Sequence, residues 1–300
     1  VIPLAPPITM PTPKSPLDRL RASIDRVDDQ IHDLLMKRAT LVEQVAAHKK
    51  DTAAPVFRPG REALILRRLI ERHEGSFPRP VLIRIWREII AGSIAIQGQA
   101  SIAVFAPDQL PGYWDLARDH FGAHAAMIPI LSAGEVIYAV AEGRAQVGVL
   151  PMPVDGERAP WWPPLMAMGA QAPFVIARLP FGVPGNARRV PGDVLVIGRG
   201  EPEPTGADRS LLLIETGAEL SRNRLITQLG AQGLEVTLFA AIEPDPDHRI
   251  NLLEIDDFVT ATDQRLARAL DPIDDRVLRA SRLGSYAKPL KAALLIEERG

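Results

Sequence analysis

The feature that most constrains the fold is an unbroken helical pattern near the start of the chain. From Leu17 to Lys50 there is no proline or glycine, and apolar residues recur every three or four positions, which is the spacing of one face of an α-helix. Ser15 is suited to cap this helix, and Asp18 is suited to its first turn. At about 1.5 Å per residue, the segment predicts a rod about 50 Å long, which is longer than a small domain is wide. Such a rod needs other chain segments to cover its apolar face.

Two shorter helices are predicted next, over residues 59–74 and 78–99, with Gly75 ending the first and Pro78 starting the second. The second of them carries a stripe of large apolar residues, namely Leu82, Ile85, Trp86, Ile89, Ile90 and Ile94. One long and two shorter helices cannot close a core around the rod by themselves. We therefore expect the first hundred residues to form an all-α unit that pairs with a second copy as a homodimer.

The pattern changes at Ser101, where short β-rich runs begin to alternate with helical segments as far as residue 151. This alternation is typical of a parallel α/β layer. A proline-rich stretch with two more candidate strands follows, and the last hundred residues predict a βαββα unit. The expected organisation is a multidomain chain, with a flexible proline-rich tail at 1–14 and domains at 15–100, 101–200 and 201–300.

Composition excludes several kinds of function. A net charge of −2 gives no reason to propose nucleic acid or an anionic membrane as a partner. The absence of cysteine excludes disulfides, thiolate metal sites and a cysteine nucleophile, and the six histidines show no metal-binding spacing, so neither a metal nor a cofactor is expected. There is no run of about 18 apolar residues, and a cytoplasmic location is expected.

Polar side chains interrupt the apolar stripes of the predicted helices. Steps of three and four from Ile31 lead to Arg38 and Lys49, and Arg21 lies one position off the same stripe. In the two shorter helices the interrupting residues are Arg61, Ser93 and Gln97, and Arg58 precedes the first of these helices. A single buried cation usually pairs with a carboxylate. The same faces supply few acids, Glu62 being the main one, so the counter-charge is expected to come from a small dianion bound between helices.

These residues include cations, an amide and a hydroxyl, but no nucleophile–base pair. A pocket of this kind can hold a flexible dianion in a reactive shape and stabilise charge on an oxygen as a bond breaks. The predicted catalysis is therefore preorganisation without a covalent intermediate.

Three segments carry a resemblance to a known family: LDRLRASIDRVDDQIHDLLMKRATLVEQVAAHKK, FRPGREALILRRL and WREIIAGSIAIQ. Over about residues 15–100 they closely resemble the all-helical class of chorismate mutase. That resemblance implies an intertwined dimer of three-helix chains that converts chorismate to prephenate by a Claisen rearrangement.

The resemblance also implies a role for each residue of the pocket. It makes Arg38 and Arg21 clamps for the two substrate carboxylates, with Arg21 acting in the partner subunit's site. Lys49 and Gln97 would hydrogen-bond the ether oxygen as its bond to carbon breaks. Arg61 and Ser93 would line the pocket, and Glu62 would accept a hydrogen bond from the substrate hydroxyl. At the position of Arg58 some members of the family have aspartate, and Arg58 is expected to frame the entrance of the helix.

The rest of the chain resembles, with eroded motifs, the dehydratase and regulatory parts of bifunctional chorismate mutase/prephenate dehydratase enzymes. The segments that carry this resemblance are AVFAPDQLPGYWDLARDHFG, VGVLPMPVDG and RLGSYAKPL. The dehydratase's Thr-Arg-Phe triplet is replaced by Gly192, Asp193 and Val194, and about forty residues stand where the family has a second lobe. Asp193 is expected to add negative charge beside a dianionic substrate. Residues 201–300 resemble an ACT regulatory domain, which implies an aromatic amino acid effector, phenylalanine or tyrosine. Only a reduced form of that family's effector-binding motif is present, at residues 241–244.

Three functional hypotheses follow from the sequence. The leading one is a chorismate mutase in phenylalanine and tyrosine biosynthesis whose C-terminal region lacks dehydratase activity. The second is a bifunctional chorismate mutase/prephenate dehydratase, and the third is a non-catalytic helical dimerisation or regulatory subunit.

Overall fold

The computed structural model describes residues 15–49, 55–98, 100–107, 110–188 and 192–295. The predicted flexible tail at 1–14 lies outside these residues. The described chain divides into two compact units, Val1–Thr52 and Ala53–Gly300. The first unit contributes α1 (Pro16–Lys49), and the second contains every other helix and all nine strands of the described residues.

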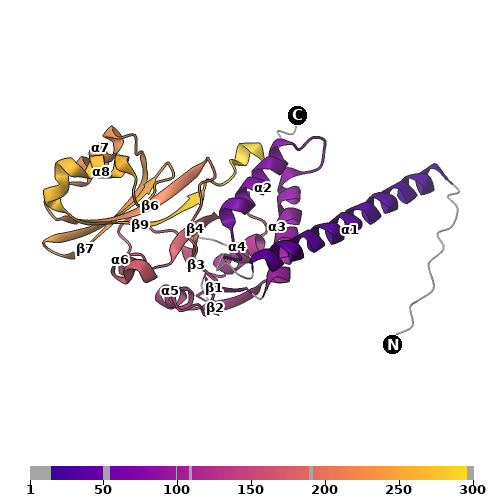
Figure 1. Ribbon diagram of the computed structural model, residues 1–300, viewed down its shortest axis with the longest axis horizontal. Helices are drawn as coiled ribbons and strands as arrows, with labels where there is room; N and C mark the ends of the chain where they lie inside the picture. Colours follow the sequence, from indigo (N-terminus) through magenta and orange to yellow (C-terminus); the bar gives the residue numbers. More distant parts are fainter. Residues whose placement is uncertain (1–14, 50–54, 99, 108–109, 189–191, 296–300) are drawn as a thin grey trace. The chain divides into compact units, whose positions relative to one another are not determined.

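The helix α1 is a single uninterrupted helix of 34 residues (Figure 1), and this confirms the prediction for the start of the chain. Ser15 and Asp18 cap its N-terminus reciprocally: the Asp18 amide donates to Ser15 Oγ at 3.1 Å, and the Ser15 amide donates to Asp18 Oδ2 at 3.0 Å.

The apolar stripe of α1 is exposed in the monomer. Its members are each at least half exposed, and apart from one gap of seven residues they are spaced alternately by three and four; they are Leu17, Leu20, Ile24, Val27, Ile31, Leu34, Leu41 and Val45. Arg38 occupies the position of this series between Leu34 and Leu41. A strict three–four repeat is the pattern of a coiled-coil seam. An apolar stripe of this length is typical of a helix that packs against a partner.

The other elements, with their bounds, are α2 Pro59–Glu71, α3 Arg79–Gln97, β1 Ser101–Phe105, α4 Gly112–Phe121, β2 Ala126–Ile130, α5 Ala133–Ala141, β3 Val147–Pro151, α6 Pro163–Met168, β4 Phe174–Leu179, β5 Val194–Gly198, β6 Asp208–Gly217, α7 Arg222–Ala231, β7 Val236–Asp245, β8 His248–Ile255, α8 Gln264–Leu270 and β9 Val277–Ala287, with 3-10 turns at Gly169–Gln171, Asp271–Arg276 and Ala292–Leu294. The elements predicted from sequence are therefore present, and β9 and α6 are additional. Among the described residues, no helix is long and apolar enough to cross a bilayer.

The helices α2 and α3 pack on the C-terminal part of the chain. Ala63, Leu66 and Ile83 form one buried cluster with Phe181 and Leu295. Burying a leucine or isoleucine side chain contributes about 1.5–3 kcal/mol to folding, so these contacts hold the two helices firmly on the α/β unit. The predicted boundary at residue 100 therefore does not coincide with a division of the structure.

All nine strands belong to one sheet, in the order β2-β1-β3-β5-β4-β9-β6-β8-β7. The pairs β1–β2 and β1–β3 are parallel, as predicted, but β5 is antiparallel to both β3 and β4. The layer expected to be parallel, as far as residue 151, is therefore parallel, and β5 joins it as an antiparallel strand. Alternate residues of β1 face opposite helices: Ile102 and Val104 pack in the cluster with α4, and Ala103 packs in the cluster with α5.

The last hundred residues form a βαββαβ unit, with α7 and α8 side by side on one face of β6–β9 (Figure 1). Its strand β9 also lies beside β4, where Gly284 is paired with Val175. Gly284 has a φ of 150°, and a Cβ there would collide with the Val175 backbone, so only glycine allows the two strands to approach. The predicted boundary at residue 200 consequently runs through a continuous sheet.

Candidate functional site

The predicted site residues of the first unit lie along α1. Arg21 is exposed, and its guanidinium is 3.8 Å from the Asp18 carboxylate. Arg38 is partly exposed within the apolar series. Lys49 is the last residue of α1, and its side chain lies outside the described part of the structure.

On α2 the neighbouring residues Arg61 and Glu62 point in different directions, because successive residues of a helix are about 100° apart. Arg61 is exposed, whereas Glu62 is only 8% exposed. The Glu62 carboxylate accepts a hydrogen bond from Arg87 of α3, with Nη1 to Oε2 at 2.8 Å. The Arg87 guanidinium also lies 5.3 Å from the ring centroid of Phe181. Glu62 thus has a partner inside the chain, and its role toward a substrate hydroxyl stays a prediction.

Burial dominates the electrostatics of this ion pair. Burial raises the pKa of Glu62 even though Arg87 acts to lower it, and burial lowers the pKa of Arg87 against the attraction of Glu62. The sequence patterns alone did not identify Arg87 as the buried partner of Glu62. Its spacing from Ile83 and Ile90, four and three residues away on the buried face of α3, is the signal that could have identified it.

Ser93 and Gln97 lie one turn apart on α3, and both side chains bond to their own helix. Ser93 Oγ donates to the Ile89 carbonyl oxygen at 2.7 Å, and Gln97 Nε2 donates to the Ser93 carbonyl oxygen at 3.0 Å. The bond to Ser93 uses one of the two N–H donors of the Gln97 amide, so the second donor can still bond to a ligand.

Arg58, directly before α2, donates through Nη2 to both carboxylate oxygens of Glu203, at 2.8 and 2.6 Å. This residue ties the start of α2 to the segment between β5 and β6. The predicted site residues are therefore divided between the two units: Arg21, Arg38 and Lys49 belong to the first, and Arg58, Arg61, Glu62, Ser93 and Gln97 belong to the second. Their assembly into one pocket stays a prediction.

Asp193, which lies directly before β5, is paired within the chain. The Asp193 carboxylate accepts from Arg178 Nε at 2.7 Å, so its charge is balanced within the chain. Arg178 also lies 3.4 Å from the buried Glu254, which accepts hydrogen bonds from Tyr286 and Arg209. Asp193 is expected from the sequence to add negative charge beside a dianionic substrate, and in the structure Arg178 offsets that charge.

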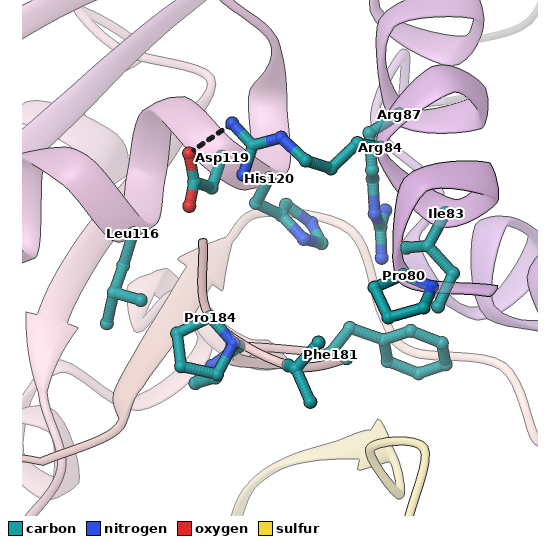
Figure 2. A pocket seen from close by; sticks show the side chains of 12 residues that line it. Pro80, Ile83, Arg84, Arg87, Leu116, Asp119, His120, Phe181 and Pro184 are labelled. Atoms are coloured by element: carbon teal, nitrogen blue, oxygen red, sulfur yellow. Dashed lines mark hydrogen bonds and ion pairs between the residues drawn. The ribbon is translucent and has the colours of Figure 1, made fainter. Parts of the chain in front are cut away.

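A small pocket lies between α3, α4 and the segment 180–184 (Figure 2). Arg84 donates to Asp119 across it at 2.8 Å, and His120 is buried behind this pair. Burial, with the nearby charge of Arg87, lowers the pKa of His120 well below 6.5, so the ring is neutral at pH 7. The cavity encloses about 40 Å³, which is room for a few waters and not for an organic substrate. The described residues contain no cluster of side chains suited to a metal.

Comparisons with known proteins agree with the sequence analysis of the helical part. Residues 20–98 match the family model described as chorismate mutase type II. The bifunctional chorismate mutase/prephenate dehydratase of Aquifex aeolicus is 31% identical over 140 residues, which cover 45% of this chain and 38% of the relative. The match thus spans about two fifths of that relative's length.

Two solved structures align with about two thirds of the chain. One, described as GqqA, a novel type of quorum quenching acylase, is 18% identical, with a TM-score of 0.48 over 65% of this chain and 97% of its own. The other, prephenate dehydratase from Arthrobacter aurescens in complex with L-Phe, is 17% identical, with a TM-score of 0.45 over 65% of this chain and 91% of its own.

The family match covers α1, α2 and α3, and the N-terminal helical part of the chain therefore carries a chorismate mutase type II domain.

Proposed function

We propose that this protein is a chorismate mutase that rearranges chorismate into prephenate in the biosynthesis of phenylalanine and tyrosine. The observation that carries the proposal is the family match over residues 20–98, together with Arg38 set in the apolar series of α1. The reaction is intramolecular and needs no nucleophile. Its rate depends on holding a dianion in a compact shape and stabilising the oxygen that gains charge.

Each site residue has a proposed part in this chemistry. Arg38 and Arg21 bind the two carboxylates, for which the planar guanidinium is well shaped. Lys49 and Gln97 hydrogen-bond the ether oxygen, and these bonds strengthen as the carbon–oxygen bond breaks. Arg61 and Ser93 line the pocket, and Glu62 accepts from the substrate hydroxyl through Oε1, while Oε2 accepts from Arg87.

The active form is proposed to be an intertwined homodimer. Along α1, the eight large apolar side chains of the stripe are each at least half exposed in the monomer. A second copy of the same helix offers a matching seam, because a two-fold axis places the same repeat on both sides. In this arrangement Arg21 of one subunit acts in the site of the other.

The C-terminal region is proposed to lack dehydratase activity and to serve as an ACT-like packing or effector-sensing part. Its βαββαβ order along the chain supports the ACT-like assignment, and an aromatic amino acid is the proposed effector. The bifunctional alternative is favoured by the description of the Aquifex aeolicus relative. The two differ in one product, since only the bifunctional enzyme would form phenylpyruvate.

The test is to incubate the purified chain with chorismate and to measure prephenate. Arg38→Ala should lower kcat/KM by about 30- to 4,000-fold, because it leaves a desolvated substrate carboxylate without its partner, a loss of about 2–5 kcal/mol. Arg26→Ala is the matched control on α1, because Arg26 is exposed and hydrogen-bonds only Ser23 among the described residues. Near-normal activity of Arg38→Ala, or no prephenate from the unmodified protein, would contradict the proposal.

A further inference from the structure

A second cavity, larger than the small pocket, lies on another side of the α/β unit. It encloses about 720 Å³, and three segments border it: residues 55–61 at the start of α2, 198–203 after β5, and 285–287 at the end of β9. Gln146 and Val147, where β3 begins, complete the wall. The segments AVFAPDQLPGYWDLARDHFG and VGVLPMPVDG continue from the opposite, carboxyl ends of β1 and β3, whereas the third such segment, RLGSYAKPL, supplies residues 285–287 to the wall. The volume is in the range of small-molecule sites.

The walls of this cleft are held in place by contacts within the chain. Arg58 is ion-paired with Glu203 at 2.6 Å. Gly200 packs so closely on Pro55 that a Cβ would lie 2.8 Å from the proline ring. The cleft is therefore formed before any ligand arrives, which reduces the ordering cost of binding.

Two arginines of the cleft are left without a counter-charge. Of its two glutamates, Glu203 pairs with Arg58, and Glu201 pairs with Arg282, which does not line the cleft. Within the described ranges, Arg61 and Arg199 form no ion pair or hydrogen bond. The Arg199 guanidinium lies against Gly143, whose built Cβ would be 3.1 Å from Nη1, and this places it beside the turn that leads to Gln146 and Val147.

The remaining lining is largely apolar. The buried side chains there are Phe57, Val147, Ile176, Tyr286 and Ala287. The Gln146 side-chain oxygen accepts from the Ser101 amide at 2.6 Å, which leaves the NH2 group of Gln146 as a further donor. An apolar wall with guanidinium groups is complementary to a molecule that has an apolar body and an anionic head.

We infer that this cleft binds a small organic anion with an apolar body, its carboxylate or phosphate head held by Arg199 and Arg61. The inference does not rest on the mutase activity. Because Arg61 is also a proposed mutase residue, the decisive variants change Arg199.

The experiment titrates the full chain with benzoate and with phenyl phosphate by calorimetry and by saturation-transfer NMR, with benzamide as the neutral analogue of benzoate. At least one anion should bind saturably and more tightly than benzamide, and its affinity should fall as salt rises. The preferred anion identifies the head group. Arg199→Gln should weaken binding about tenfold or more, since it removes a charge-assisted hydrogen bond, and Arg199→Glu should weaken it further.

The matched control is Arg279→Gln, because Arg279 is exposed on β9, lies outside the cleft and has no ion pair among the described residues; it should bind like the unmodified chain. Arg38→Ala should also retain anion binding. The inference is overturned by absence of saturable binding, by equal affinity for benzamide, by unchanged binding in Arg199→Gln, or by loss of binding in Arg38→Ala. Prephenate formation measured on the same preparation separates failure of this cleft from failure of the proposed mutase.

Discussion

Glu62 and Arg87 are an oppositely charged pair buried between α2 and α3, with both side chains almost fully shielded from solvent. Burying two charges costs several kcal/mol for each, and their attraction compensates only while both are present. Glu62 lies on the buried face of α2 together with Leu66 and Ile70, while Arg61 stays exposed.

Removing one partner should therefore cost more than removing both. Arg87→Met or Glu62→Leu alone should lower the free energy of unfolding by about 3–5 kcal/mol, because each leaves a buried charge unpaired, whereas the double variant should recover most of this loss. Urea unfolding at one fixed protein concentration measures the effect. Glu142→Ala, which breaks an exposed ion pair with Arg144, should cost about 1 kcal/mol or less. Strictly additive losses in the double variant would show that the two side chains are not coupled.

At the scale of elements, α1 decides how the helical part can assemble. Its 34 residues carry an exposed apolar series that a monomer leaves in water. The proposed dimer covers this series, and it also divides each site between subunits, with Arg21 and Arg38 of one site on different chains.

Mixing two inactive variants tests this division. Arg21→Ala and Arg38→Ala should each be nearly inactive alone, but after subunit exchange half of the dimers are mixed, and each mixed dimer has one intact site. Activity should then rise to about a quarter of the unmodified value. Labelled subunits would verify the exchange. If exchange occurs without any gain, Arg21 acts in its own subunit's site.

At the scale of the whole molecule, the C-terminal part is built into one sheet that extends across both predicted C-terminal domains. A polar network joins its halves: Arg178 of β4 contacts Asp193, Glu254 and Tyr286, and Arg209 links Glu254 to Asp256. The side chain of Asp193 thus takes part in internal packing.

The chain should accordingly form no phenylpyruvate from prephenate above the uncatalysed rate. Gly192 and Val194 offer no side-chain donor for a leaving hydroxyl, and Asp193 is occupied by Arg178. Chromatography of the reaction products measures this outcome, with a bifunctional relative such as that of Aquifex aeolicus as the positive control. Catalysed phenylpyruvate formation would instead establish the bifunctional alternative.

Local sequence patterns determined most of the secondary structure of this molecule. The three–four spacing from Leu17 to Val45 and the caps Ser15 and Asp18 specify α1, and the βα alternation after Ser101 specifies most strands, because both signals arise between residues close in sequence. The same spacing identified Arg38 as an exception on an apolar face.

Contacts between distant segments decided the rest. The strand β9 has a mixed polar pattern, and its place in the sheet depends on Gly284 meeting Val175, more than one hundred positions earlier. The pairing of Glu62 with Arg87 depends on how α2 and α3 pack. The pairing of Asp193 with Arg178 depends on the register of β4 against β5. The sequence by itself determined which segments are helices and strands and which charges interrupt their apolar faces. Only the tertiary structure decided where the units divide and which charges are neutralised inside the chain, because partners far apart in sequence leave no periodic signal in either segment.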